Sequence, residues 1–287
     1  MTIPSSDASP KLADQTIAVV GLGLIGGSLA KALQVNTNNT VQGYDINPNI
    51  VKSALAEGVL DSELQLEQCD MVLIALYPEA TIDFVKNNWN RFKKGAVIID
   101  CAGVKAEICA ELSEAASKHD LYFVGGHPMT GIERSGYEHS FAHLFSGGTM
   151  ILCRDKYTNI IALKAAEMLF TAIGFLKITI TNAADHDRII AFTSQLPHVV
   201  AGAFIRSETA KQQLGFSAGS YQDLTRVAHL NEAMWSELFL ANRENLIAEI
   251  EGLKDRLQEY IEVLQLGDEQ QVLSLLALGT KAKDLYG

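Results

Sequence analysis

The segment TIAVVGLGLIGGSLA, residues 16–30, decides the fold because a short apolar run leads directly into a glycine-rich turn. The glycines have the spacing GxGxxG, and a helical pattern begins within the turn. In a strand–turn–helix context, Gly21 permits the tight turn, Gly23 lets a pyrophosphate approach the backbone, and Gly26 lets the helix pack closely on the strand. The segment therefore predicts a dinucleotide-binding turn, with a glycine-rich turn that binds no ligand as the alternative.

The residues after this turn complete the predicted cofactor site. The helix starts near Leu24 and Ile25, where backbone N–H groups without a helical partner can bind phosphate. Asp45 ends the next β-rich run, where a carboxylate can accept a hydrogen bond from a ribose 2′-hydroxyl. A carboxylate repels a 2′-phosphate, and residues 46–48 contain no arginine to bind one. The pattern predicts NAD rather than NADP, although Asp45 could also be a simple turn residue.

Strand and helix patterns alternate up to about residue 181. The β-rich runs are residues 16–21, 41–45, 71–76, 96–100, 121–125, 149–153 and 176–180. Helical stretches separate most of these runs, the longest of them around residues 159–174. Alternation at this spacing indicates βαβ units and a mostly parallel sheet.

The remainder of the chain has helical patterns only. They cover residues 185–210, 231–264 and 268–285, while residues 215–226 are a predicted loop with one short helix. In the second pattern, apolar side chains recur mostly at intervals of three and four: Leu238, Ile247, Ile250, Leu253, Leu257, Ile261 and Leu264. Little else in the chain can bury this stripe, which suggests that it packs against a second subunit.

These patterns define the expected fold class: an α/β Rossmann-type dinucleotide-binding domain followed by an all-α dimerisation domain. We expect a flexible polar tail at residues 1–14, the NAD-binding domain at residues 15–182, and a helical substrate and dimerisation domain at residues 183–287.

The composition narrows the class of protein further. With 48% hydrophobic and 20% charged residues, it is typical of a soluble globular protein, and a net charge of −11 gives no indication of nucleic-acid binding. The four cysteines lack metal-ligand spacing, which predicts free thiols and no metal site. No run approaches the length of a membrane span and no signal-peptide core is present, so we expect a cytoplasmic protein without membrane contact.

Three further segments carry candidate chemistry. His127, in GGHPMTG, follows a predicted parallel strand, and the carboxyl ends of such strands hold ligands, so it is a candidate acid–base group. Ser194 and His198 are four residues apart and can share one face of a helix. Arg226 follows in DLTR. Taken one at a time, these histidines could equally be structural, Arg226 could be a solvated surface residue, and Trp235 is expected in the core.

Taken together, the segments closely resemble the prephenate/arogenate dehydrogenase family. GLGLIGGSLA, GGHPMTGIERSG, ADHD, SQLPHVV and QDLTRVA followed by MW occur in the family's order and approximate spacing, from about residue 16 to residue 235. The combination of GGHPMTG, LPH and DxTR is far more specific than the glycine-rich turn alone. The resemblance implies a Rossmann domain followed by a helical domain that interlocks in a homodimer.

The resemblance also implies a role for each matching residue. His127 would take the proton of the substrate's ring hydroxyl while hydride leaves for the nicotinamide. Arg226 would hold the carboxylate on the substrate ring, and His198 would reach the substrate's side chain. Glu133 matches an acid at the pocket entrance, and Ser194 matches a residue that lines the same pocket.

Two positions depart from the family pattern. Gly103 stands where relatives often have a serine whose hydroxyl bonds the catalytic histidine, so we expect water or a backbone group to replace it. Gln222 stands where relatives often have lysine or arginine. We still expect oxidative decarboxylation of prephenate to 4-hydroxyphenylpyruvate in tyrosine biosynthesis, because His198, Ser194 and Gln222 are possible donors to a keto group. The alternatives are an arogenate dehydrogenase, another hydroxyacid dehydrogenase of similar architecture, and a non-catalytic NAD-sensing protein.

Overall fold

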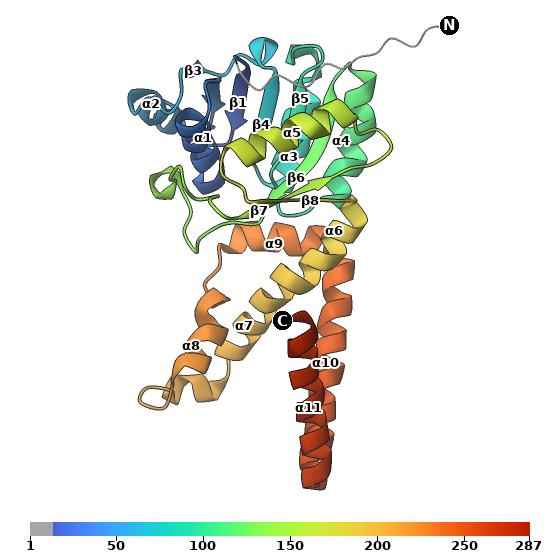
Figure 1. Cartoon of the computed structure of the whole chain (residues 1–287). Coiled ribbons are helices and arrows are strands. Elements are labelled where there is room, and N and C mark those ends of the chain that lie inside the picture. Colours follow the sequence, from blue (N-terminus) through green and yellow to red (C-terminus); the bar gives the residue numbers. More distant parts are fainter. Residues whose placement is uncertain (1–13) are drawn as a thin grey trace, which may run out of the picture.

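The computed structural model describes residues 14–287, so most of the predicted tail lies outside the described residues. Its centre is a single sheet with the strand order β3-β2-β1-β4-β5-β6-β7-β8 (Figure 1). The strands are β1 (Thr16–Val20), β2 (Thr40–Tyr44), β3 (Ser62–Glu63), β4 (Met71–Ile74), β5 (Val97–Asp100), β6 (Tyr122–Pro128), β7 (Thr149–Cys153) and β8 (Lys177–Thr181). All neighbouring pairs are parallel except β6 and β7.

Helices cover both faces of this sheet, which explains why its central strands are continuous apolar runs. In β1, Ile17 and Val19 belong to one buried cluster and Ala18 and Val20 to the other. The first cluster includes residues of α1 (Leu24–Asn36), α2 (Pro48–Ala56) and α5 (Ile160–Ala172), and the second includes residues of α3 (Pro78–Asn87) and α4 (Ala106–Lys118). The predicted mostly parallel, doubly covered sheet is confirmed.

Two strands differ from their predicted extents. The two-residue strand β3 was not predicted, because a run this short carries no periodic signal. Strand β6 extends beyond the predicted residue 125, because residues 125–128 pair with Met150–Cys153 of the antiparallel strand β7. His127 therefore lies within a strand, which fixes its backbone more firmly than a loop would.

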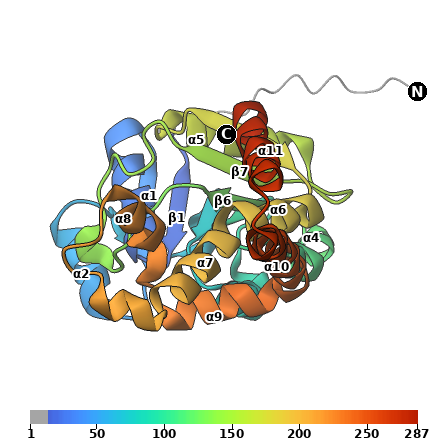
Figure 2. The ribbon, with the colours of Figure 1, turned by 90° about the horizontal axis from the view of Figure 1, so that it is seen from below.

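Helices alone make up the chain after β8. Helix α6 (Ala183–Ile190), a π-helical segment (Ala191–Gln195) and α7 (Leu196–Ile205) form one rod that begins beside the sheet (Figure 1). The other helices are α8 (Gly219–Thr225), α9 (Glu232–Ala241), α10 (Arg243–Leu266) and α11 (Glu269–Tyr286). Figure 1 shows α7 with α8, and α10 with α11, leaving the sheet as two separate legs, and Figure 2 shows α9 crossing beside α7.

The predicted helix over residues 231–264 is wrong at one point, because the chain breaks at Asn242 between α9 and α10. The side chain of Asn242 is buried and donates to the carbonyl of Asp187 and to Oε1 of Gln195, at 2.8 Å each. These bonds join the break to the α6–α7 rod. A helical hydrophobic pattern continues through such a break, so the pattern did not reveal it.

The rod from Ala183 to Ile205 is the one helix of the described part that meets a length and hydropathy test for a membrane span. Its mean hydropathy is 1.2, and 28% of the window is buried within the chain. The rod also contains buried His186, Asp187 and Gln195, whose side chains bond to other elements of the fold. These bonds join the rod to the start of α4, to β6 and to α9. The four cysteines are unpaired and buried, as expected.

Candidate active site

The turn between β1 and α1 has the geometry that its glycines predicted. Gly21 has a φ of 84°, in the left-handed region that favours glycine. A Cβ on Gly26 would lie 1.7 Å from the carbonyl oxygen of Gly21, so any larger residue would force the turn open. A Cβ on Gly23 would meet nothing within 4 Å. The surface beside Gly23 is therefore open to a ligand, as a pyrophosphate-binding turn requires.

The start of α1 and the end of β2 form the remainder of this candidate dinucleotide site. Gly23 is the N-cap and supplies no side chain, and the first turn has no acidic residue, so the N–H groups of Leu24 and Ile25 lack a helical partner. The carboxylate of Asp45 accepts from the N–H groups of Leu22 at 2.8 Å and Asn47 at 2.9 Å. One oxygen is used in each bond, and each keeps a lone pair for a ribose hydroxyl.

His127 is the first member of a bonded row of side chains. Its Nδ1 lies 2.9 Å from Nε2 of His186, and Nδ1 of His186 lies 2.7 Å from Oδ1 of Asp187. His127 retains some exposure, but the surrounding protein desolvates it and lowers its pKa well below the usual value, with further lowering by His186 and the ammonium of Lys105. Burial also lowers the pKa of His186, and the hydrogen bond to Asp187 opposes that shift.

A buried lysine lies behind this row. Lys105 is fully buried, forms an ion pair with Asp100, and donates to the carbonyl of Gly126 at 2.6 Å, one residue before His127. Burial raises the pKa of Asp100, while Lys105 opposes that rise. The backbone N–H groups of Lys105 and Ala106 donate to the carboxylate of Asp187, at 2.8 Å each. The network thus joins β5, β6, α4 and α6.

Sequence reasoning did not select Asp100, Lys105, His186 or Asp187 as site residues. All four lie in segments that the family resemblance had already brought to attention, DCAGVK and ADHD. A buried lysine cannot be distinguished from a surface lysine by sequence pattern, and the two segments are 82 residues apart at the Lys105–Asp187 bond.

Gly103 lies next to the other ring nitrogen of His127. A Cβ built on Gly103 would be 3.9 Å from Nε2 of His127 and 3.2 Å from Cδ2 of Leu238, in α9. A hydroxyl at this position would therefore be close to the histidine, as the family pattern implies. The methyl groups of Leu238 border this space, and replacement of the hydroxyl by water or a backbone group stays a prediction.

The residues predicted in the helical part form a second group, which is linked to the loop after β6. Nδ1 of His198 lies 2.9 Å from the carbonyl oxygen of Val227, and its ring lies 3.9 Å from that of Trp235. The guanidinium of Arg226 forms an ion pair of 2.5 Å with Glu133. The structure thereby brings His198 next to the backbone beside Arg226, and joins Arg226 to the loop that follows His127.

Ser194 and Gln222 lie on two separate helical segments. Ser194 lies in the π-helical segment, where the N–H of Leu196 bonds the carbonyl of Ala191, and this segment continues directly into α7 with His198. π-Helical turns occur frequently at functional sites. The neighbouring Gln195 is buried and donates to the carbonyl of Leu238 at 3.1 Å. Gln222 is exposed on α8, one turn before Arg226.

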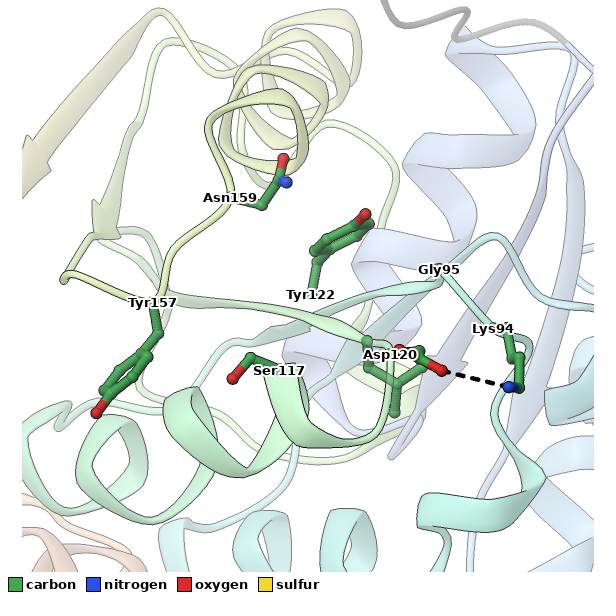
Figure 3. Close-up of a pocket in the computed structure, with 8 residues that line it drawn as sticks. Lys94, Gly95, Ser117, Asp120, Tyr122, Tyr157 and Asn159 are labelled. Atoms are coloured by element: carbon green, nitrogen blue, oxygen red, sulfur yellow. Dashed lines mark hydrogen bonds and ion pairs between the residues drawn. The ribbon is translucent and has the colours of Figure 1, made fainter.

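A surface pocket lies at the opposite end of the strands from the glycine-rich turn and His127. Its lining includes Lys94, Asp120, Tyr122, Tyr157 and Asn159, at the amino ends of β5 and β6 and after β7 (Figure 3). Lys94 and Asp120 form an exposed ion pair of 3.2 Å. Ligands of open α/β sheets bind at the carboxyl ends of the strands, where the glycine-rich turn and His127 lie. We therefore assign the active site to that edge.

A dinucleotide-binding turn and a desolvated histidine at the carboxyl edge of a parallel sheet define the class of a dinucleotide-dependent oxidoreductase. The family described as the nucleotide-binding domain of prephenate dehydrogenase matches residues 29–177, and the one described as its dimerization domain matches residues 182–278. The chain belongs to the prephenate dehydrogenase family.

Individual relatives agree with this assignment. The chain is 27% identical to the prephenate dehydrogenase of Lactococcus lactis over 93% of this chain and 76% of the relative. It is 30% identical to the cyclohexadienyl dehydrogenase of Zymomonas mobilis over 80% and 82% of the two chains. A crystal structure of Aquifex aeolicus prephenate dehydrogenase with hydroxyphenyl propionate and NAD+ superimposes with a TM-score of 0.83 and 28% identity, covering 96% of this chain and all of the other.

Two glycine substitutions should separate folding from cofactor binding. Gly26→Ala places a methyl group on the carbonyl of Gly21 and should lower the free energy of unfolding by about 3 kcal/mol or more. Gly23→Ala meets no atom within 4 Å and should change it by about 1 kcal/mol or less, yet weaken dinucleotide binding. Urea unfolding and calorimetric titration with NAD measure the two effects. Wild-type NAD affinity in Gly23→Ala would show that the turn does not contact the pyrophosphate.

Proposed function

We propose that this chain catalyses the oxidative decarboxylation of prephenate to 4-hydroxyphenylpyruvate, with NAD as the hydride acceptor, in tyrosine biosynthesis. The observation that carries the proposal is the environment of His127. One ring nitrogen is bonded to His186, and the other faces Gly103 at the carboxyl edge of the sheet. Membership of the prephenate dehydrogenase family supports the substrate class.

The cofactor site favours NAD. The open surface at Gly23 and the free N–H groups of Leu24 and Ile25 suit a pyrophosphate, and Asp45 suits the hydroxyls of a ribose. The Aquifex aeolicus relative was crystallised with NAD+. When bound, NAD supplies the acceptor for the hydride that leaves the substrate's carbinol carbon.

His127 has the protonation state that a base requires. A desolvated histidine next to a buried ammonium stays neutral at neutral pH, because its pKa is lowered well below the usual value. His127 would take the proton of the ring hydroxyl as the carbon is oxidised. Loss of the ring carboxylate as CO2 then leaves an aromatic phenolate, which takes the proton back. No net proton is released, and formation of the aromatic ring drives the reaction.

Arg226 would supply the positive charge that an anionic substrate needs on a protein with a net charge of −11. Its planar guanidinium can bind a carboxylate through two parallel hydrogen bonds. In the structure Nη1 of Arg226 donates to Oε1 of Glu133. The substrate's ring carboxylate would replace Glu133 on Arg226, with Ser194 and His198 lining the site near the side chain of the substrate.

The choice between prephenate and arogenate depends on groups near that side chain. The ammonium of arogenate requires an acceptor, and Glu133 can supply one once the ring carboxylate has replaced it on Arg226. Ser194 and Gln222 can donate to the keto group of prephenate. His198 donates through Nδ1 to the carbonyl of Val227, so its Nε2 donates to a substrate only when the ring is protonated. Near that side chain, the candidate donors Ser194 and Gln222 outnumber the one candidate acid, Glu133, and this balance favours prephenate.

A homodimer formed through the helical part is the proposed assembly. The second matching family is described as a dimerization domain. On α10, Leu257 is 54% exposed, Ile261 48% and Leu264 65%, and α11 has no buried residue.

Sedimentation tests this assembly. The wild-type protein should sediment with twice the mass of one chain, and Ile261→Glu should shift the measured mass toward that of one chain, because a charge would be buried in the interface. A wild-type protein that sediments as a single chain at micromolar concentration would contradict the proposal.

Replacing the base should abolish most turnover without affecting the cofactor. His127→Asn should lower kcat by about 10²–10⁴ in an NADH absorbance assay, with NAD affinity unchanged. His119→Asn, at an exposed histidine after α4, is the matched control and should keep the wild-type kcat. A near-normal kcat in His127→Asn would exclude His127 as the base.

Removing the guanidinium should weaken substrate binding. Arg226→Ala should raise KM for prephenate about 10- to 100-fold, because a charged hydrogen bond contributes roughly 1.5–3 kcal/mol, and NAD affinity should change little. The control is Arg188→Ala, which removes an exposed ion pair with Asp185. If KM is the same in both variants, Arg226 serves only to pair with Glu133.

The substrate preference has its own measurement. We expect kcat/KM with NAD to be higher for prephenate than for arogenate. Glu133→Gln should change the two values unequally if Glu133 contacts the side chain of the substrate. Glu138→Gln, in the short 3-10 helix Tyr137–His139, should change neither. A preference of about tenfold or more for arogenate in the wild type would show that an acid near the side chain determines the choice.

A further inference from the structure

The base function of His127 depends on where its single proton lies. A neutral imidazole carries a proton on one nitrogen and a lone pair on the other. The nitrogen next to Gly103 is Nε2, 3.9 Å from a Cβ built on that glycine. If Nε2 carries the proton, His127 cannot accept one from a substrate. Gly103 offers no side-chain hydrogen bond to this nitrogen, so another group must hold the histidine in its active form.

We propose that Asp187 and His186 are positioning residues that hold His127 as the Nδ1–H tautomer, with the lone pair on Nε2. The inference rests on the proposed function for its catalytic consequence. The tautomer itself can be tested without turnover.

The argument begins at Asp187, where the direction of hydrogen bonding is fixed by the backbone. Its two carboxylate oxygens accept from the N–H groups of Lys105 and Ala106, at 2.8 Å each, and a backbone N–H can only donate. These donors lie at the start of α4, which also favours a negative charge. Asp187 is therefore an acceptor. The nitrogen 2.7 Å away, Nδ1 of His186, must carry a proton to bond with it.

The same reasoning determines which nitrogen of His127 carries the proton. A neutral His186 with its proton on Nδ1 has a lone pair on Nε2, which lies 2.9 Å from Nδ1 of His127. That nitrogen must in turn carry a proton, and Nε2 of His127 is left with the lone pair. The opposite direction would require a cationic His186. The buried ammonium of Lys105 and the complete burial of the His186 side chain both oppose a second positive charge.

The bonded side chains of Asp187, His186 and His127 also suit the later step, in which the proton returns to the product. After Nε2 accepts the substrate proton, the imidazolium of His127 keeps its Nδ1–H bond to the neutral acceptor on His186. The proton remains on Nε2, from which it returns to the phenolate after CO2 leaves. His186 and Asp187 do not touch the substrate, so their replacement should affect kcat more than KM.

Nitrogen NMR of the whole protein, labelled at histidine and saturated with NAD, tests the tautomer directly. The signals of His127 are assigned by their loss in His127→Asn. At neutral pH we expect Nδ1 of His127 to carry a proton and Nε2 to carry none. A proton on Nε2, or a cationic His186, would overturn the inference whatever the activity of the protein.

Two substitutions at His186 test the consequence. His186→Leu removes the acceptor, so the proton of His127 can move to Nε2, and kcat should fall by about 10²–10⁴ with KM and NAD affinity little changed. His186→Gln keeps an oxygen near the position of Nε2 and should recover most of that loss. A folded His186→Leu with wild-type kcat would overturn the inference, as would a His186→Gln variant no better than His186→Leu.

The experiment separates this inference from the proposed function. If the NMR shows the expected tautomer but prephenate is not oxidised, the row of side chains is correct and the proposed reaction is wrong. If prephenate is oxidised normally and Nε2 of His127 carries the proton, the reaction stands and the row is wrong. Should His186→Leu fail to fold, the NMR of the wild-type protein still decides.

Discussion

The ammonium of Lys105 is buried between the sheet and the helical part of the chain, and several contacts of the candidate site depend on this charge. The ammonium of Lys105 is compensated by Asp100 and by the carbonyl of Gly126. Breaking a buried ion pair costs about 3–5 kcal/mol, so the loop between β5 and α4 has one stable position. Its backbone N–H groups bind Asp187 and thereby dock α6 against the sheet. Burial lowers the pKa of the neighbouring His127, and the charge of Lys105 adds to that lowering.

Residues of the helical part also lie near the carboxyl ends of the central strands. Leu238 of α9 packs beside Gly103, and Gln195 and Asn242 join α9 and α10 to the α6–α7 rod. Farther along, Arg226 contacts the loop after β6 through Glu133. The base, the cofactor turn and the candidate anion-binding residue thus belong to three elements distant in sequence. Buried side chains join His127 to α6, whereas an exposed ion pair joins Arg226 to the loop after β6.

Much of the fold could be predicted from the sequence, because hydrophobic periodicity and the glycine spacing are local features of the chain. Seven of the strands, the mostly parallel sheet and the turn at Gly21 followed from them. The break at Asn242, the π-helical segment and the short β3 did not, since each depends on tertiary bonds or lacks a periodic signal. In the site, His127 was recognised by its motif, whereas His186, Asp187 and Lys105 were not. Their importance arises from burial and from pairing across the fold, which no local pattern records.

The central claim is that this chain couples oxidation of prephenate to loss of its ring carboxylate. The most direct measurement follows NADH, CO2 and 4-hydroxyphenylpyruvate together in one reaction of the full chain with prephenate and NAD. The account predicts equal amounts of all three, formed at the same rate. Formation of NADH without CO2 would identify a simple hydroxyacid dehydrogenase, and NAD binding without any of the three products would identify a binding protein. Either result would contradict the account.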